Sequence, residues 1–436
     1  MLSKTFKMLG LSAALTAIAG PAMAEVSPET AYVFNTFLFL VCGFLVMFMA
    51  AGFSMLESGM VRSKNVATIC LKNVSLFSIA GLMYWLVGYN LMYGIEEGGY
   101  IGELFSVWSA DDSAIAGETP DFSGGYAAGS DWYFQMVFCA TTASIVSGTI
   151  AERMKLWPFL IFTLFLTGFI YPIVGSWEWG TGWLDAQGFS DFAGSTLVHS
   201  TGGWAALMGA IILGARSGKY GPDGSVNPMP GSSMPLATLG TFILWLGWFG
   251  FNGGSQLALG SGADAAAISN IFINTNMAAA AGVVVAMIAS NLLYGKIDLT
   301  MALNGAIGGL VSITAEPLTP SIGSAVFIGG FGGLLVVLTV PLLDKFKIDD
   351  VVGAIPAHLV CGIWGTLIVP FTNSDASYGV QLTGVIAVGI FTMVTSGILW
   401  SALKATIGLR IDEEDELAGL DKTELGIEAY PEFSRS

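Results

Sequence analysis

Eleven apolar stretches run through this sequence, and they leave few folds open to it. A bilayer core about 30 Å thick needs about 20 apolar residues in a helix to cross it. The approximate ranges are 32–56, 66–93, 132–151, 157–175, 192–214, 235–254, 265–293, 301–316, 322–343, 351–371 and 379–407. Lipid forces the backbone to form its hydrogen bonds internally, and the short alternating segments of a membrane β-barrel are absent from the sequence. The pattern therefore predicts an all-α polytopic membrane protein.

Composition agrees with this class. Charged residues make up 11% of the chain, against about 25% in soluble domains. The net charge of −16 argues against a nucleic-acid partner. All four cysteines fall inside apolar stretches, with no spacing typical of a metal site or a disulfide framework, so no cofactor is expected.

The first 24 residues predict a cleaved signal peptide. Lys4 and Lys7 precede an apolar segment, and Ala22-Met23-Ala24 forms a cleavage site. An uncleaved short anchor is the alternative. The expected domains are thus the signal peptide, 1–24, a transmembrane domain, 25–409, and a C-terminal tail, 410–436.

Lysine and arginine follow the odd-numbered stretches, whereas the loops 94–131, 176–191, 255–264, 317–321 and 372–378 contain neither. By the positive-inside rule, this distribution predicts an N-terminus outside and a cytoplasmic C-terminus. We therefore expect a multi-pass protein of the inner (plasma) membrane.

The only two histidines, His199 and His358, both lie in apolar surroundings, where an unpaired imidazole is costly. They occupy the fifth and tenth stretches, which run in opposite directions. This placement predicts an inverted repeat of spans 1–5 and 6–10, with the histidines close together at mid-depth. Two independent, satisfied core histidines are the alternative.

Two adjacent imidazoles can share one N–H···N hydrogen bond and present their other nitrogens to a lumen. Such a pair suits a proton relay or a small hydrogen-bonding solute. It does not suit zinc, which needs three or four ligands. Asp191 precedes the fifth stretch and either caps that helix or stabilises an arriving cation.

Aromatic residues gather near the predicted outer ends of the helices: Phe134, Phe138, Trp179 and Phe251. They form either an interfacial belt or a cup in which cation–π attraction of about 0.5–2 kcal/mol favours a small cation. The Ser255 hydroxyl would add an acceptor to such a cup.

Four segments together resemble the ammonium transporter family (Amt/Mep/Rh), and its bacterial Amt-type members in particular. They are DFAGSTLVH, GWFGFNGGS, FQMVFCATTASIVSGTIAER, and IDD followed by HLVCGIWGTL. The resemblance covers nearly the whole mature chain. It implies an eleven-span homotrimer, with a pore through each subunit, that is a transporter and not an enzyme.

By position, the resemblance also implies site residues. Those of the outer substrate site are Trp179, Ser255, Phe138 and Asp191. Those of the gate are Phe138 and Phe251, with Phe134 nearby. Those of the pore proton relay are His199 and His358.

The segment 408–430 resembles the family's regulatory C-terminus, which docks PII-type signal proteins. It departs from the common pattern at Leu425, where a His-Gly-Glu sequence often begins, and at Ile427, which replaces the acid.

We therefore expect uptake of ammonium and methylammonium through a hydrophobic pore. NH4+ would be recruited at the aromatic site and deprotonated, and NH3 would cross while the histidine pair relays the proton. The alternatives are a passive channel for NH3 or another gas, an ammonium sensor acting through the tail, and a membrane metalloenzyme.

Overall fold

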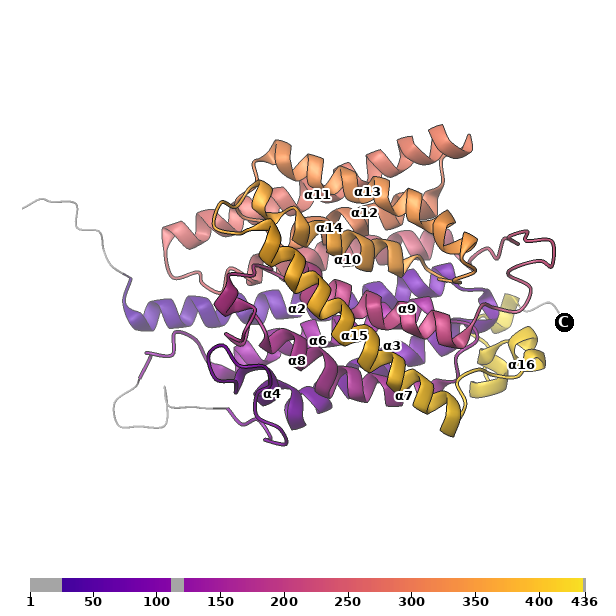
Figure 1. Ribbon diagram of the computed structural model, residues 1–436, viewed down its shortest axis with the longest axis horizontal. Coiled ribbons are helices and arrows are strands. Elements are labelled where there is room, and N and C mark those ends of the chain that lie inside the picture. The colour runs from indigo at the N-terminus through magenta and orange to yellow at the C-terminus, as the bar shows by residue number, and fades with distance from the viewer. Residues whose placement is uncertain (1–25, 111–120, 434–436) are drawn as a thin grey trace, which may run out of the picture.

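The computed structural model describes residues 26–110 and 121–433, which form a bundle of helices (Figure 1). Within these residues the only β-structure is a pair of isolated bridges, Met154 with Arg410 and Tyr220 with Val226. The predicted signal peptide lies outside the described residues. The all-helical class predicted from the apolar stretches is confirmed over the described chain.

The helices follow the order of the apolar stretches. Their bounds are α2 (Pro28–Met60), α3 (Val66–Met83), α4 (Tyr89–Tyr93), α6 (Ala128–Thr149), α7 (Leu156–Phe165), α8 (Tyr171–Ser176), α9 (Thr201–Leu213), α10 (Met234–Gly254), α11 (Gly262–Tyr294), α12 (Leu299–Thr314), α13 (Ile322–Lys345), α14 (Cys361–Leu367), α15 (Tyr378–Thr406) and α16 (Glu413–Ala418). Several are extended by π-helical turns: η2 (Tyr84–Gly88), η3 (Leu166–Ile170), η5 (Ser195–Ser200) and η6 (Ile355–Val360).

Among the described residues, eight helical stretches are long and apolar enough to cross a membrane. They are Pro28–Met60, Ser63–Tyr93, Leu156–Ser176, Ser195–Leu213, Met234–Gly254, Gly262–Tyr294, Ile322–Lys345 and Tyr378–Thr406. Three other predicted spans correspond to α6, α12 and the stretch from η6 to α14, and are not among these eight. The predicted number of eleven spans therefore stays a prediction.

The interior position of α6 explains its modest hydrophobicity. Every residue from Phe134 to Thr149 is buried, so this part of the helix contacts other parts of the protein rather than lipid. Its hydroxyls donate to carbonyls one turn back, as Thr141 does to the Val137 carbonyl at 2.8 Å. A helix enclosed in this way can carry polar side chains, since each finds a partner inside the bundle.

Glycine allows the closest helix contacts. The helix α2 packs along α10, and α11 packs against α12 and α13. A Cβ atom on Gly52 of α2 would lie 3.0 Å from the Leu244 backbone nitrogen of α10, and one on Gly305 of α12 would lie 2.7 Å from the Gly282 carbonyl oxygen of α11. Small residues are the usual solution where membrane helices approach closely.

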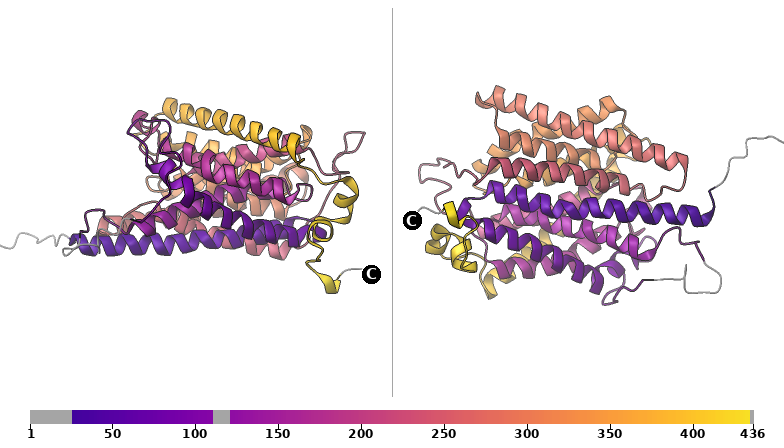
Figure 2. Two further views of the ribbon diagram at one scale, coloured as in Figure 1. Left: turned by 90° about the horizontal axis from the view of Figure 1, so that it is seen from below. Right: turned by 180° about the vertical axis from the view of Figure 1, so that it is seen from behind.

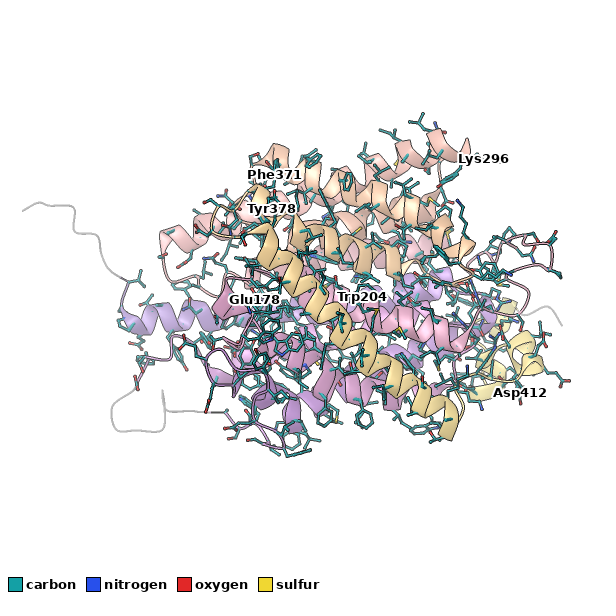
Figure 3. The ribbon with its side chains drawn as sticks, in the orientation of Figure 1. Glu178, Trp204, Lys296, Phe371, Tyr378 and Asp412 are labelled. Atoms are coloured by element: carbon teal, nitrogen blue, oxygen red, sulfur yellow. The ribbon has the colours of Figure 1, made fainter. Side chains whose placement is uncertain are left out.

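The two ends of the bundle differ. We call the end that carries residues 409–433 the tail end, and the opposite end, with residues 94–110 and 121–127, the loop end. The helix α2 protrudes at the loop end (Figure 2). Lys296 and Asp412 lie toward the tail end, whereas Glu178, Phe371 and Tyr378 lie toward the loop end (Figure 3).

The tail supplies caps to two helices that lack their own side-chain caps. The Asp421 carboxylate accepts hydrogen bonds from the backbone nitrogens of Ala67 and Thr68, at 2.9 and 2.8 Å, in the first turn of α3. Glu424 accepts from the Leu156 nitrogen at the start of α7, at 3.0 Å. Carboxylates at helix N-termini satisfy free N–H groups and oppose the helix dipole. The tail is thus bound to the bundle by its acids.

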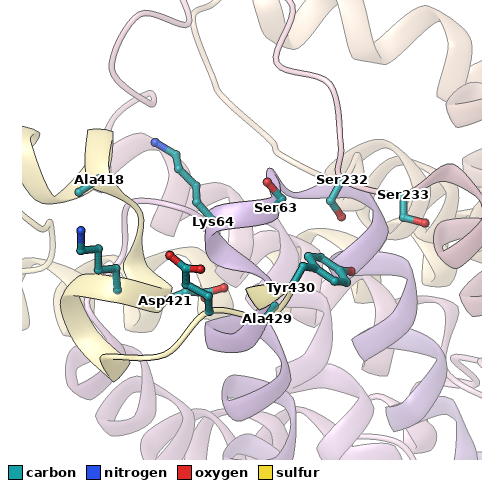
Figure 4. A pocket seen from close by; sticks show the side chains of 10 residues that line it. Ser63, Lys64, Ser232, Ser233, Ala418, Asp421, Ala429 and Tyr430 are labelled. Carbon is teal, nitrogen blue, oxygen red and sulfur yellow. The ribbon is translucent and has the colours of Figure 1, made fainter. Parts of the chain in front are cut away.

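A cavity of about 510 Å3 remains between the tail and the loop that follows α2 (Figure 4). The residues that line it are Ser63, Lys64, Ser232, Ser233, Ala418, Asp421, Lys422, Glu428, Ala429 and Tyr430. On one side of it, the Lys64 ammonium donates to the carbonyls of Glu416 and Leu417 at 2.8 and 2.6 Å. The tail therefore packs onto the loop at defined points and leaves space between them.

A buried ion network sits at the same end. Arg216, 5% exposed, contacts Asp349 at 2.8 Å and Glu152 at 3.3 Å, and Glu152 also pairs with Arg62. Burial raises the pKa of Asp349, but the hydrogen bonds and charge of Arg216 together with the charge of Arg153 outweigh it, so the pKa lies well below its usual range. The ionised carboxylate is the form that the fold stabilises.

We predict that Asp349→Asn lowers the free energy of unfolding by about 3 kcal/mol, because Arg216 loses a buried partner. The low folded-state pKa means that the Asp349 contribution is fully present above the unfolded pKa of about 3.9 and is lost as the pH falls below it. Thermal unfolding in detergent should give a constant difference between wild type and variant from pH 8 to pH 5. A difference that disappears already at pH 6 would contradict this account.

We also predict that Asp421→Ala releases the tail, because three hydrogen bonds to α3 are lost. Trypsin should then cleave after Lys422 at least several times faster than in wild type. Glu413→Ala is the matched control, since Glu413 is an exposed acid of the same tail. Equal cleavage rates in the two variants would show that Asp421 does not hold the tail.

Candidate functional site

A cavity of about 570 Å3 opens at the loop end, and we call it the vestibule. Its lining residues are Tyr89, Tyr93, Tyr126, Asp131, Phe134, Gln135, Phe138, Glu178, Trp179, Thr181, Asp185, Phe192, Ser255 and Leu257. The structure thus brings together four residues predicted from the sequence, namely Phe134, Phe138, Trp179 and Ser255. They come from α6, the segment after α8, and the end of α10.

Stacked phenylalanine rings close the bottom of the vestibule. The Phe138 and Phe251 centroids are 4.0 Å apart with their planes at 26°, and Phe134 lies 4.8 Å from Phe138. All three side chains are buried. Trp179 meets Phe138 edge to face at 6.1 Å. The stack places three buried apolar rings next to one another beside the vestibule.

Two hydrogen bonds position the polar side of the vestibule. The Trp179 indole N–H donates to the Asp191 carbonyl at 3.0 Å, which fixes the ring. The Ser255 hydroxyl donates to the Phe251 carbonyl at 2.9 Å, so its oxygen lone pairs remain available to a ligand.

Asp191 is fully buried and is not among the vestibule's lining residues. Its carboxylate accepts hydrogen bonds from four successive backbone nitrogens, Gly194 to Leu197, at 2.7–3.1 Å. The capping role weighed from the sequence is therefore present in the structure. It fixes the start of η5, which carries His199.

The two histidines lie against each other beneath the phenylalanine stack. Their Nδ1 atoms are 3.2 Å apart and their ring centroids 5.2 Å apart, with exposures of 0% and 4% for His199 and His358. One Nδ1 must carry the shared hydrogen and the other must accept it. The alternative of two independent core histidines is wrong.

Aromatic rings hold the upper histidine. His199 stacks on Trp248 at 4.9 Å and lies 5.2 Å from Phe251. Trp248 is fixed in turn by its indole N–H, which donates to the Thr314 hydroxyl at 2.8 Å. The His199 Nε2 atom has no hydrogen-bond partner within the described part of the chain. This nitrogen is therefore free to form a further hydrogen bond.

Both histidines sit in π-helical turns, η5 and η6. Each follows a capping aspartate by eight residues: Asp191 caps η5, and Asp350 accepts from Gly353 and Ile355 at 3.2 and 2.7 Å before η6. Single π-helical turns are frequent at functional sites, where the extra residue redirects a side chain. Here the redirected side chains are the facing imidazoles.

Two smaller cavities continue from His358 toward the tail end. The first, about 10 Å3, is lined by Phe53, Leu56, Glu57, Ser144, Ile145, Gly148, Asn304, Ile307, Val352, Ala354 and His358. The second, about 210 Å3, shares Asn304 and Val352 with the first and also includes Asp344 and Asp350. We call them the inner cavity and the mouth. They complete a line of sites from one end of the bundle to the other.

Sequence reasoning missed several polar residues along this line. Asp131 accepts from the Tyr89 hydroxyl at 2.5 Å, and Glu178 accepts from the Asp191 nitrogen at 2.8 Å. Burial, and next the charge of Asp191, raise the pKa of Glu178 well above its usual range. The signal for Glu178 was its place beside Trp179. The signal for Glu57 was its position as an acid in the long apolar helix α2.

The fold and these sites define a helical membrane protein whose centre holds a phenylalanine stack and a buried histidine pair between separate cavities. A family model described as "Ammonium Transporter Family" matches residues 37–430. The chain belongs to the ammonium transporter family, as the sequence resemblance indicated.

Known relatives agree. The chain is 41% identical to "Ammonium transporter Amt2" of Archaeoglobus fulgidus, over 96% of this chain and 93% of that protein. Among solved structures, a "Sensor Amt Protein" is similar, with a TM-score of 0.84 and 37% identity over 91% of this chain and all of that one. Mep2 of Candida albicans gives a TM-score of 0.78 and 26% identity, over 94% of each chain.

We predict that Asp191→Ala lowers the free energy of unfolding by about 2 kcal/mol or more, because buried backbone N–H groups lose their acceptor. Thermal unfolding in detergent would measure it. Asp185→Ala, which removes an exposed acid at the same end of the bundle, is the control and should unfold like wild type. Equal melting of both variants would remove the capping account of Asp191.

Proposed function

We propose that this protein carries ammonium, and methylammonium, across the inner (plasma) membrane to the cytoplasm. The observation that carries the proposal is the pair of facing imidazoles below a phenylalanine stack and an aromatic vestibule. In this proposal Trp179, Ser255 and Phe138 bind NH4+, and Asp191 supports them by holding the Trp179 ring and the η5 turn.

The physical argument for separating the proton from ammonia is the cost of charge in an apolar passage. Moving a bare ion into low dielectric costs roughly 20 kcal/mol in the idealised Born estimate, whereas neutral NH3 avoids this cost. Phe138, Phe251 and Phe134 form the gate at which ammonium loses its water of hydration. The imidazoles of His199 and His358 pass the proton, since each ring can accept at one nitrogen while it donates at the other.

Orientation and assembly belong to the same proposal. The tail end, which carries Arg62, Arg216 and Lys296, faces the cytoplasm by the positive-inside rule. The chain spans the membrane eleven times as an inverted repeat, supported by the matching Asp-to-His spacing in η5 and η6. It assembles as a homotrimer, as the family resemblance implies. A PII-type protein is the proposed partner of the tail.

The first experiment is solid-supported-membrane electrophysiology on proteoliposomes given an ammonium pulse. We expect a saturable, ammonium-specific current that falls to background in a variant carrying both His199→Ala and His358→Ala, because the proton path is broken. Thr201→Val, a buried change in the helix that follows η5, is the matched control and should retain the current. An undiminished current in the double variant would exclude the relay.

Two other outcomes point elsewhere. Ammonia-driven internal pH change without any current would favour a passive NH3 or gas channel. The absence of both signals would favour a sensor, a reading supported by the similarity to the protein titled "Sensor Amt Protein" and by the docked tail. The sensor reading predicts that ammonium changes trypsin cleavage after Lys422.

A further inference from the structure

We propose that Glu57 is the group that receives the proton from His358 and delivers it to the mouth. The inference rests on the proposed function and adds a residue to its passage. Glu57 and His358 line the same inner cavity, which lies between the histidine pair and the mouth.

Burial of the Glu57 carboxyl group costs free energy of desolvation, and packing alone does not explain why an acid stands at this position. It lies in α2, is 1% exposed, and sits among helices on every side. A carboxyl group in such a place is expensive unless it has partners, and in membrane segments such acids commonly mark proton paths. The inner cavity gives this one access to a mobile proton.

The contacts of the carboxyl group leave one oxygen free. Its Oε2 accepts from the Ser147 hydroxyl at 2.8 Å and from the Asn73 amide at 3.2 Å. Its Oε1 is buried and has no hydrogen-bond partner within the described part of the chain. One oxygen thus anchors the group, and the other is available to accept a proton.

A nearby cation keeps this acid from being isolated. Lys72, 2% exposed, donates to the Ser147 carbonyl at 3.0 Å and lies over the Phe159 ring at 4.5 Å. Lys72 and Glu57 thus both contact Ser147, which places a cation beside the acid. Lys72 is not among the residues that line the inner cavity, so Glu57 alone of the two faces His358.

The inner cavity has room for a water molecule that could connect His358 with Glu57. Its volume of about 10 Å3 corresponds to roughly one water molecule. A water there would have polar neighbours in Glu57, His358 and Ser144. The proton leaves a nitrogen of His358 for this water, which passes one of its own protons to Oε1. The resulting carboxylic acid then releases its proton toward the mouth, which shares Asn304 and Val352 with the inner cavity, and is again a carboxylate.

The test compares ammonium-evoked currents of reconstituted wild type, Glu57→Gln, Glu57→Asp and Ser147→Ala. The amide of Gln keeps the size and an acceptor for Ser147 but cannot cycle a proton. We expect at least a tenfold loss of current in Glu57→Gln, and a loss of no more than about threefold in Glu57→Asp. Ser147→Ala removes an anchoring hydrogen bond but not the carboxyl group, and should retain most of the current.

Thermal unfolding of each variant separates proton transfer from folding. A Glu57→Gln protein with wild-type current would overturn the proposal. So would a Ser147→Ala protein that loses as much as Glu57→Gln, or an Asp variant that is no better than Gln while equally stable, since these results indicate a structural role. A wild-type protein without any current would instead overturn the proposed function on which this inference depends.

Discussion

The contact between two buried imidazole nitrogens, 3.2 Å apart, is the interaction on which the rest of the central site depends. Neither ring could stay in apolar surroundings alone, because its polar nitrogens would lack partners. The π-helical turns, their aspartate caps and the stacked Trp248 all serve to hold the rings in this position. The phenylalanine stack lies against His199 on one side of the pair, and the inner cavity is lined by His358 on the other.

The charged groups at the two ends of the bundle have different surroundings. At the loop end, the carboxyl groups of Asp131 and Glu178 lie among aromatic rings in the vestibule. At the tail end, Arg216 and Asp349 neutralise each other in the interior, and Asp421 and Glu424 use their charge to cap helices. The tail is therefore part of the folded bundle and contacts α3 and α7 directly.

The long apolar stretches made the helical bundle predictable, since lipid allows little other structure. The histidine pair was predictable because two imidazoles in a chain this apolar need each other. The low hydrophobicity of α6 has a cause that hydropathy does not record: this helix is buried in the bundle at every residue from Phe134 to Thr149. Glu178 and Glu57 were missed because a single acid near an apolar stretch looks the same whether it faces water, a cation or a pore.

By itself, the sequence determined the membrane class, the order of the helices and the family, because those follow from local composition and from motifs of fixed spacing. Only the tertiary structure decided which polar groups meet: that Asp191 caps a turn rather than lining the vestibule, that Asp421 reaches across the chain to α3, and that Glu57 shares a cavity with His358. These contacts join residues far apart in sequence. Their geometry is set by how the helices pack, and no local pattern records it.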